Sequence, residues 1–461
     1  MRALLVDPKV NLPIDVRSSP SLGLAYLAAM SEQRGDEVRL LDMQVEDTSL
    51  QEVVAKHPPA VVGITATTIQ IESAWQVARE LRRLTDARII LGGSHPTVLP
   101  DESVQRPEVD IVVRGEGELT WMELCDHLEQ GKALDGVLGI TYEQDGEVVH
   151  NPDRPVVKEV DSLPFPAYHL YRMEHYSNLQ PTLDHIEGPS YPILSSRGCP
   201  YRCNYCSQIL PRGWRARSPE SVVSEWRWLV KDLGAAEIGV LDDSFNIDRQ
   251  RALDICDLII AEGLNHVPWI MINGIRANLA DEELLGRMRE AGCIRTAFGV
   301  ESGNQRILDT VIHKQLTLDQ VRAAFKAAKA VGMETIGFFI IGLPGETEET
   351  MEDTIRFACE LDPVVANFSM ATPFPGTEMY DQVLENGRLL VHDWHEFAFF
   401  ENKAQFETHE MPAELVERKW REAYRRFYLR PHRVVRTLLR SRTWLELPRT
   451  LRIAWKTVVS S

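Results

Sequence analysis

The sequence predicts an α/β protein with two parallel β-sheets in tandem, followed by a helical tail. The first sheet is expected to be doubly wound, and the second to form a partial barrel of six β/α units. Apolar runs rich in valine, isoleucine and leucine alternate with amphipathic helical patterns over residues 1–150, and the alternation resumes at residue 191. Such alternation is typical of parallel sheets covered by helices. The predicted segments are an N-terminal domain (1–150), a linker (151–190), a core domain (191–390) and a C-terminal region (391–461).

The N-terminal domain contains five short apolar runs that predict buried strands. These runs are residues 3–6, 37–43, 60–65, 88–91 and 110–113. Helical patterns with apolar residues three and four positions apart lie between them, at residues 22–34, 69–84 and 120–129. The prediction is a doubly wound parallel sheet, and ligands of such sheets bind beyond the carboxyl ends of the strands.

A hairpin and a proline-rich linker are expected to follow this sheet. The apolar runs 139–143 and 147–150 flank Gln144-Asp145-Gly146, and Asp-Gly is a strong two-residue turn signal. From residue 151 periodicity fades and prolines accumulate, which predicts an extended connection between two domains. Its tyrosines at positions 168, 171 and 176 are expected to pack against a core rather than to line a site.

Three cysteines at C-x3-C-x2-C spacing begin the core domain, in the stretch Ser195–Cys206. Thiolates are soft ligands, and clustered cysteines of this kind hold iron–sulfur clusters or zinc. Structural zinc takes four protein ligands, whereas no fourth cysteine or nearby histidine follows here. Cys199, Cys203 and Cys206 therefore favour a four-iron cluster with one iron left open to a small molecule. A zinc site with a distant fourth ligand is the alternative.

Six further strand patterns predict the partial barrel. They are residues 193–195, 237–241, 269–273, 295–300, 335–341 and 364–370, with helical patterns at 219–233, 249–262, 281–291, 318–331 and 348–361. Active residues of such barrels lie at the carboxyl ends of the strands. Polar or glycine-rich sequences follow five of these strands, among them Asp242-Asp243, Glu301-Ser302 and Gly342-Leu343.

The cysteine spacing, with Tyr205 just before the last cysteine, resembles the signature of the radical S-adenosylmethionine (SAM) superfamily. The order of the strand ends is similar to the branch that includes cobalamin-dependent methylases and anaerobic cyclases. The resemblance implies that the three cysteines ligate a 4Fe-4S cluster. It further implies roles for residues that match the family pattern in this sequence. Tyr205, Gly342 and Leu343 would lie by the adenine of SAM, Glu301 and Ser302 would bond its ribose or methionine part, and Asp243 would face the shared cavity.

The N-terminal domain resembles the Rossmann-like cobalamin-binding domain that precedes many radical SAM cores. The resemblance is carried by residues 20–29, 92–97 and 115–120. No D-x-H-x-x-G motif is present, so the resemblance implies cobalamin bound without the histidine that this motif supplies. The expected cobalamin contacts are Thr65, Thr67, Gly92, Gly93, Ser94 and Glu116. His95 is expected to be a hydrogen-bonded turn residue.

This family resemblance implies reductive cleavage of SAM to a 5′-deoxyadenosyl radical and methyl transfer from methylcobalamin to an unactivated carbon. Oxidative ring closure or rearrangement with the same cofactors is the alternative. The implied partners are a small-molecule or lipid-like substrate and a low-potential electron donor of the flavodoxin or ferredoxin type. A methylthiotransferase acting on RNA is disfavoured, because Cys125 is the sole cysteine of the N-terminal domain. A zinc- or cluster-binding electron carrier would leave the strand-end motifs unexplained.

The composition limits which partners and which cellular compartment can be expected. The net charge of −18 over 461 residues argues against a nucleic-acid partner. Seven cysteines, three of them clustered, fit a reducing compartment. Residues 1–7 read as a strand and not a signal peptide, and no run of 18 apolar residues occurs, which predicts a cytoplasmic protein.

The C-terminal region is predicted to be helical and basic. Arginines dominate from residue 418 to residue 456, while one helix face is apolar, with Trp420, Tyr424 and Phe427. A basic amphipathic helix of this kind can lie on an anionic membrane surface. A helix that caps the acidic protein is the alternative, and it is favoured.

Overall fold

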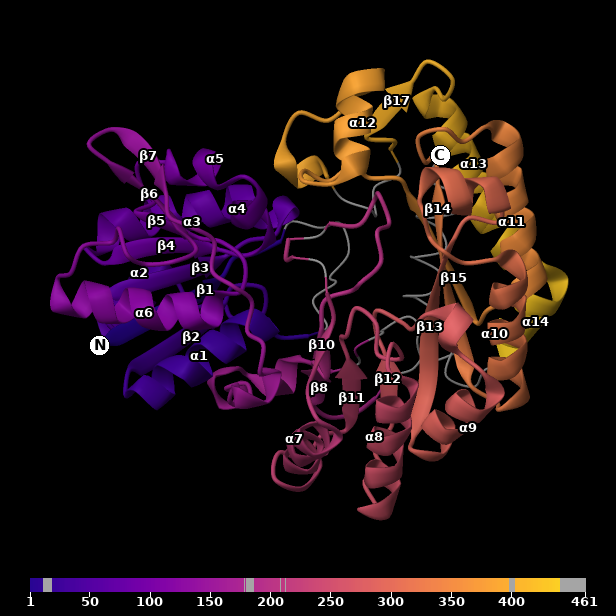
Figure 1. The fold of residues 1–461 in the computed structure, drawn as a ribbon, viewed down its shortest axis with the longest axis horizontal. Coiled ribbons are helices and arrows are strands. Elements are labelled where there is room, and N and C mark those ends of the chain that lie inside the picture. Colours follow the sequence, from indigo (N-terminus) through magenta and orange to yellow (C-terminus); the bar gives the residue numbers. More distant parts are fainter. Residues whose placement is uncertain are drawn as a thin grey trace.

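Two large β-sheets, of seven and six strands, lie on either side of the segment that carries the three cysteines (Figure 1). The computed structural model describes residues 1–10, 19–177, 179, 186–207, 209–211, 213–397 and 403–439. Within these ranges no helix is long and apolar enough to cross a membrane. Residues 440–461, the end of the C-terminal region that was predicted to be helical and basic, lie outside the described part of the chain.

The N-terminal sheet has seven strands in the order β2-β1-β3-β4-β5-β6-β7. The first five, which pair in parallel as predicted, are β1 (Arg2–Asp7), β2 (Glu37–Asp42), β3 (Val61–Thr65), β4 (Arg88–Gly92) and β5 (Ile111–Val113). Chain order reverses between β1 and β3, and ligands of open α/β sheets bind at such a switch point.

Helices cover both faces of this sheet, so the doubly wound arrangement is confirmed. The helices α1 (Leu22–Arg34) and α6 (Gly117–Gln130) share one apolar core with one face of the sheet. The helices α2 (Leu50–Lys56) and α3 (Ile71–Leu84), with the short turns α4 (Ser94–Val98) and α5 (Pro100–Val104), lie on the other side or along the strand ends. The helix α2 was not predicted, because its seven residues span only about two turns and give little periodicity. The helix α6 begins three residues earlier than the predicted residue 120.

The predicted hairpin is present and extends the same sheet. Strand β6 (Ile140–Gln144) pairs antiparallel with β5 and with β7 (Glu147–His150). Asp145 and Gly146 have φ values of 54° and 83°, which a type I′ turn requires. The linker then forms three short 3-10 turns, Val160–Ser162, Tyr168–Leu170 and Met173–His175, and its three tyrosines are buried as expected.

The second sheet is entirely parallel and has six strands, as the periodicity predicted. In spatial order they are β8 (Ser190–Ile193), β11 (Glu237–Val240), β12 (Trp269–Met271), β13 (Cys293–Glu301), β14 (Glu334–Ile341) and β15 (Val365–Met370). The largest difference from the predicted bounds is in the first strand. Residues 193–195 were predicted as the first strand, but the chain leaves the sheet after Ile193. The reason is that the backbone N–H of Ser195 donates to the carboxylate of Asp242 at 2.6 Å instead of to a neighbouring strand.

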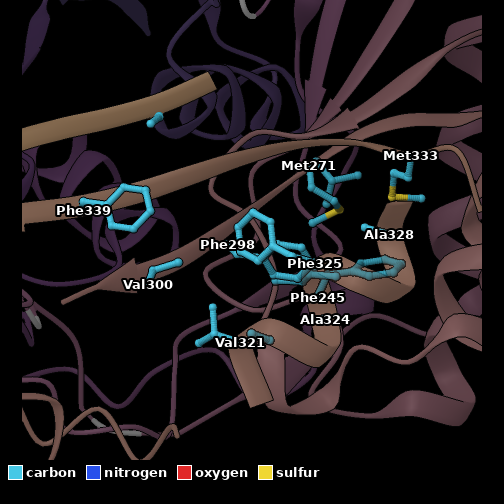
Figure 2. Close-up of a cluster of buried hydrophobic side chains, with 14 of the residues drawn as sticks. Phe245, Met271, Phe298, Val300, Val321, Ala324, Phe325, Ala328, Met333 and Phe339 are labelled. Carbon is cyan, nitrogen blue, oxygen red and sulfur yellow. The ribbon is translucent and has the colours of Figure 1, made fainter. Parts of the chain in front are cut away.

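Five helices cover the outside of this sheet and enclose the larger core. They are α7 (Pro219–Lys231), α8 (Arg249–Ala261), α9 (Glu282–Glu290), α10 (Leu318–Ala330) and α11 (Glu348–Leu361). Figure 2 shows part of the core, where Phe298 of β13 lies against Phe325 of α10 with ring centroids 5.0 Å apart. Outside the cysteine loop, Cys125, Cys256 and Cys293 are buried, whereas Cys359 is only partly buried.

The C-terminal region covers the open edge of the second sheet. After α12 (Glu378–Asn386) and an antiparallel pair β16 (Gly387–Leu389) and β17 (Phe406–Thr408), helix α13 (Ala413–Tyr428) packs along the edge strand β15, and α14 (Pro431–Leu439) follows. Aromatic side chains four residues apart on α13 bond the strand's unpaired backbone groups. Trp420 donates to the carbonyl of Phe368 at 2.7 Å, and the Tyr424 hydroxyl accepts from the Phe368 N–H at 3.3 Å. Covered edges resist pairing with other chains.

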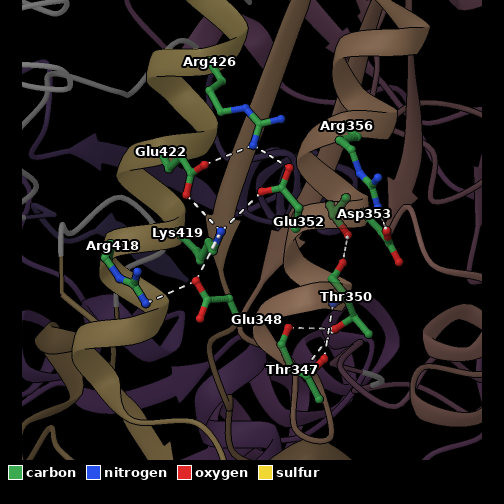
Figure 3. Close-up of polar contacts among 11 residues, drawn as sticks. Thr347, Glu348, Thr350, Glu352, Asp353, Arg356, Arg418, Lys419, Glu422 and Arg426 are labelled. Carbon is green, nitrogen blue, oxygen red and sulfur yellow. Dashed lines mark hydrogen bonds and ion pairs between the residues drawn. The ribbon is translucent and has the colours of Figure 1, made fainter.

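The basic face of α13 is paired with acidic residues of the protein itself (Figure 3). Lys419 and Arg426 both reach Glu352 of α11 and Glu422 of their own helix. For α13 this arrangement fits the favoured capping helix; the basic residues from 440 onward lie outside the described part of the chain.

Candidate active site

The cysteine loop, defined as residues 198–214, is closed at its base by a two-stranded hairpin that the sequence did not predict. Strands β9 (Ser196–Arg197) and β10 (Arg215–Ala216) pair antiparallel, with Arg197 opposite Arg215. Gly198 has a φ of 81°, and a Cβ there would lie 2.5 Å from the carbonyl oxygen of Gly213. Only glycine allows this close approach where the loop starts.

The three thiols of this loop influence one another. Desolvation, and then the charges of the Cys203 and Cys199 thiols, raise the pKa of Cys206 to about 12. Desolvation also raises the pKa of Cys199, with the Asp243 carboxylate and the Cys203 thiol adding to it. Among the described residues, no three His, Cys, Asp or Glu side chains converge closely enough to hold a metal ion as they stand. Ligation by these three cysteines therefore stays a prediction.

Two adjacent carboxylates just after β11 accept hydrogen bonds from the residues at the start of the cysteine loop. Asp242 is fully buried and accepts hydrogen bonds from Ser195 N, Ser195 Oγ and Ser196 Oγ at 2.5–2.6 Å. Asp243 accepts from the N–H of Gly198 at 3.1 Å. Partial desolvation, and then the charge of Asp242, raise the pKa of Asp243. Asp243 thus lies near the thiols, while its place facing a substrate cavity stays a prediction. The sequence did not reveal Asp242 as the residue that anchors the start of the loop.

Glu301 ends β13 in a strained conformation and forms an ion pair with Lys314. Glu301 has a φ of 67°, and the register of β13 against β14 shifts there. Its Oε1 accepts from Lys314 Nζ at 2.8 Å, and both side chains are about nine-tenths buried, with exposed fractions of 9% and 10%. Lys314 also donates to the hydroxyl of Tyr205 at 3.1 Å. The structure therefore brings together two predicted site residues, Glu301 and Tyr205, through a lysine that was not predicted.

Lys314 sits in a short segment of unusual backbone. Its neighbours His313 and Gln315 both have a φ of 53°, a left-handed conformation that costs non-glycine residues free energy. Arg276 holds this segment by donating to the carbonyls of Lys314 and Gln315 at 2.9 and 3.1 Å, and its guanidinium lies 3.6 Å from the ring centroid of Tyr201 in the cysteine loop. No spacing in the sequence marks Lys314, because its partners are set by the fold.

Two cations therefore lie near the thiols. Burial alone would lower the pKa of Lys314, but the Glu301 carboxylate and then the Cys203 thiol outweigh it, and the pKa is raised. The positive charge of Arg276 lowers the pKa of Cys199, whereas the neighbouring Cys203 thiol raises it. Three soft donors on one loop, faced by fixed positive charge, fit an anionic iron–sulfur cluster.

The remaining predicted SAM contacts lie at neighbouring strand ends. Ser302 is buried within hydrogen-bonding distance of Thr354, with 3.2 Å between their hydroxyl oxygens. The N–H groups of Gly342 and Leu343 both donate to Oε2 of Glu346, at 2.9 and 3.0 Å. Burial raises the pKa of Glu346 to about 7.

The residues expected to contact cobalamin gather at the carboxyl ends of β3 and β4. Thr65 is paired with Gly92 in the register, and Thr67 donates to Oε1 of Gln70 at 2.9 Å. Gly93 has a φ of 106°, and a Cβ there would lie 2.5 Å from the backbone of Ala66. Ser94 follows at the start of α4. These contacts order the strand-end loops but do not test cobalamin binding.

His95, in the same loop, is enclosed. Its ring lies between Trp75 and Trp394, with centroids 6.3 and 5.0 Å away, and its Nε2 is 3.4 Å from Oε2 of Glu102. Trp394, from the chain beyond the second sheet, donates to the same carboxylate at 2.9 Å. His95 was expected to be a hydrogen-bonded turn residue; it lies buried in the short helix α4, with its Nδ1 3.4 Å from the Thr68 hydroxyl, where the C-terminal region meets the N-terminal sheet.

Glu116 is the predicted cobalamin contact whose surroundings are most specific. It stands at the N-terminus of α6, and both of its oxygens accept hydrogen bonds from Arg215, at 2.9 and 3.0 Å. Arg197, two residues before Cys199, donates to it at 3.1 Å. The structure thus links Glu116 to the base of the cysteine loop.

Both the N-terminal and the core part of the chain match known protein families. Residues 193–358 match the family model described as the radical SAM superfamily, and residues 17–125 match the B12 binding domain. An uncharacterized methyltransferase of Pyrococcus horikoshii is 37% identical over 448 residues, which cover 95% of each chain. An anaerobic magnesium-protoporphyrin IX monomethyl ester cyclase of Rubrivivax gelatinosus is 31% identical over 414 residues, 87% of this chain and 72% of the cyclase.

A solved structure has the same fold. The radical S-adenosylmethionine methyltransferase TsrM from Kitasatospora setae, with cobalamin and a [4Fe-4S] cluster bound, superposes with a TM-score of 0.70 at 23% identity. The superposition covers 83% of this chain and 78% of that one.

Proposed function

This chain belongs to the cobalamin-binding radical SAM family of enzymes, and we propose that it transfers a methyl group to an unactivated carbon of a small-molecule substrate. Its cofactors are cobalamin, a 4Fe-4S cluster and SAM, as the two matched families and their solved relatives indicate. When bound, these groups supply the electron, the 5′-deoxyadenosyl radical and the methyl group, which no side chain can supply.

The single observation that best supports the proposal is the contact between the cysteine loop and the N-terminal sheet. Leu210 of the loop lies over Gly115, 3.8 Å from the position of a Cβ there, and Arg197 reaches Glu116. Chemistry that uses both cofactors on one substrate needs their two binding regions side by side, and short distances between reacting groups account for much of the rate of such steps.

In this proposal Cys199, Cys203 and Cys206 hold the cluster, and Asp242 holds the loop through Ser195 and Ser196. Glu301, Ser302, Gly342 and Leu343 contact SAM, with Tyr205 beside its adenine. Asp243 faces the substrate cavity, where its raised pKa suits a group that takes up or holds a proton. Thr65, Thr67, Gly92, Gly93 and Ser94 contact cobalamin.

The proposed partners are a small-molecule substrate and a low-potential electron donor of the flavodoxin or ferredoxin type, and the proposed location is the cytoplasm. A lipid-like substrate and membrane contact through the C-terminal region stay predictions. The basic residues Lys419 and Arg426 are already paired with acidic neighbours, which argues against a free basic surface on α13.

Anaerobic reconstitution with iron, sulfide and hydroxocobalamin, followed by metal and corrin analysis, tests the cofactor set. The expected result is about four irons and one corrin per chain, with iron lost in Cys203→Ala. Cys359→Ala is the matched control, because this partly buried thiol lies on α11 and should leave the iron content unchanged. Iron without corrin, or iron retained in Cys203→Ala, would contradict the proposal.

A ring-closing or rearranging enzyme is the second candidate, and the 31% identity to a cyclase favours considering it. The two are separated by incubating the reconstituted enzyme with SAM and titanium(III) citrate. A methyltransferase should form S-adenosylhomocysteine in an amount matching the bound corrin. Formation of 5′-deoxyadenosine without S-adenosylhomocysteine would favour the cyclase reaction.

A further inference from the structure

Four charged residues join the N-terminal sheet to the base of the cysteine loop, and we name them the interdomain ion cluster: Glu116, Glu118, Arg197 and Arg215. Arg197 donates to Glu116 at 3.1 Å and to Glu118 at 2.7 Å, and Arg215 donates to both oxygens of Glu116. The four side chains have exposed fractions of only 7–16%. Ion pairs that are buried to this extent are screened by salt much less than ion pairs on the surface.

The cluster is extended by the linker and by α1. The N–H of Val157 donates to Oε2 of Glu116 at 2.7 Å, and Arg215 donates to the carbonyl of Val157 at 2.6 Å. The guanidinium of Arg197 lies 5.1 Å from the ring centroid of Tyr26. With two donations from Arg215, one from Arg197 and one from Val157, the carboxylate of Glu116 is fully used within the protein.

The arrangement of the two arginines explains why the hairpin needs this partner. Arg197 and Arg215 stand directly opposite each other in the β9–β10 pair, and like charges in that position destabilise a hairpin. A hairpin with only two residues in each strand gains little from its own hydrogen bonds. The carboxylates of Glu116 and Glu118 offset the repulsion, and both belong to the other domain.

We propose that Glu116 is a positioning residue for the cysteine loop and not a contact to cobalamin, so that the N-terminal domain completes the cluster-binding site of the core domain. The inference rests on the proposed function in one respect, namely that the cysteine loop holds the cluster. It also accounts for the placement of Leu210 over Gly115, since closing the hairpin at Arg197 and Arg215 directs the loop toward the N-terminal sheet.

Glu116→Gln tests the inference, with Glu123→Gln as the matched control. Glu123 lies on the same helix and pairs with Arg154 of the linker, but it does not contact the cysteine loop. Hydrogen exchange of the cofactor-free full chain is measured first. Peptides covering residues 196–217 should exchange about tenfold faster or more in Glu116→Gln, because a charge-assisted network is lost, and should be unchanged in Glu123→Gln.

The reconstituted protein provides the second readout. Glu116→Gln should release iron to a chelator about tenfold faster than the unmodified chain, while its affinity for hydroxocobalamin stays within about twofold. The opposite pattern, weakened corrin binding with unchanged iron release and exchange, would overturn the inference and restore Glu116 as a cobalamin contact.

A second pair of variants keeps the test decisive if Glu116→Gln does not fold. Arg215→Gln removes one of the opposed charges from the core side, and its hairpin peptides should also exchange faster. The double variant Glu116→Gln/Arg215→Gln should be no worse than Glu116→Gln alone, because the two act through one network. Additive effects would overturn the inference. Failure of the unmodified chain to bind iron would instead refute the proposed function, and the exchange result would still stand.

Discussion

The ion pair between Lys314 and Glu301 offers a quantitative test of how the site is built. Lys314→Met keeps the length and apolar stem of the side chain but removes its charge. Because Glu301 is about nine-tenths buried, the change leaves a carboxylate without its 2.8 Å partner. Breaking one member of a buried pair typically costs about 3–5 kcal/mol. Removing both charges, in Glu301→Gln/Lys314→Met, should restore most of that loss, because a buried pair and a neutral substitute are often nearly equal in free energy.

Urea unfolding of the cofactor-free chain under anaerobic, reducing conditions measures this free energy of unfolding. Lys419→Met is the matched control for losing a buried, paired lysine, since its side chain is 8% exposed and lies on α13 among Glu348, Glu352 and Glu422. A loss below about 1 kcal/mol in Lys314→Met, the range of an exposed pair, would refute the reasoning. A double variant Glu301→Gln/Lys314→Met that is as unstable as Lys314→Met alone would also refute the reasoning.

In the reconstituted protein, the reduction potential of the cluster should distinguish Lys314→Met from Lys419→Met. Lys314 acts electrostatically on Cys203, and the net charge around a cluster sets its reduction potential. Lys314→Met should therefore lower the potential measured by a redox titration followed by electron paramagnetic resonance. Lys419→Met should leave it unchanged. An unchanged potential in both would show that the ammonium does not act on the cluster.

Three further predictions concern the strand ends and the covered edge. Glu346 has a pKa of about 7, above the ordinary 4.5, so between about pH 4.5 and 7 the folded chain binds a proton that the unfolded chain does not. The free energy of unfolding should fall by up to about 3 kcal/mol as the pH rises through that window, and Glu346→Gln should flatten this slope; an equal slope in the variant would contradict it. Gly299→Ala should weaken the ion pair between Lys314 and Glu301, because a Cβ there would lie 2.5 Å from Oε1 of Glu301 and 3.0 Å from Lys314 Nζ. If urea unfolding shows the variant to be as stable as the unmodified chain, that clash does not occur. Tyr424→Phe should cost about 1 kcal/mol of unfolding free energy, since it frees backbone groups of the edge strand β15; no loss would indicate that water replaces the hydroxyl.

The order of the strands along the chain could be predicted because it depends on local periodicity. The eleven strands predicted to be parallel all occur, five in the first sheet and six in the second, and the two strands of the predicted hairpin extend the first sheet. Asp145 and Gly146 formed the predicted turn because their own backbone preferences decide it. Elements too short to show a period, such as α2 and the β9–β10 hairpin, were missed for the same reason.

The candidate site was predictable where chemistry is written in consecutive residues. The spacing of Cys199, Cys203 and Cys206 needs no fold to be recognised. Glu301 and Asp243 could be selected because each lies at the carboxyl end of an apolar strand pattern, in a place that matches the family pattern. Their partners could not be selected in this way, since a lysine thirteen residues after Glu301 has no pattern that distinguishes it from a surface lysine.

The sequence by itself determined the two α/β units and the three thiols, because each is encoded by short-range spacing, and its resemblance to a known family indicated the class of enzyme. Tertiary structure alone decided how these parts act together. Glu116 meets Arg197 and Arg215 across 81 and 99 residues of chain, and Trp394 reaches Glu102 across 292. Periodicity shows which face of an element is buried, but it does not show what that face is buried against. Sheet order and the docking of the two domains decide that, and so they decide which charges find partners.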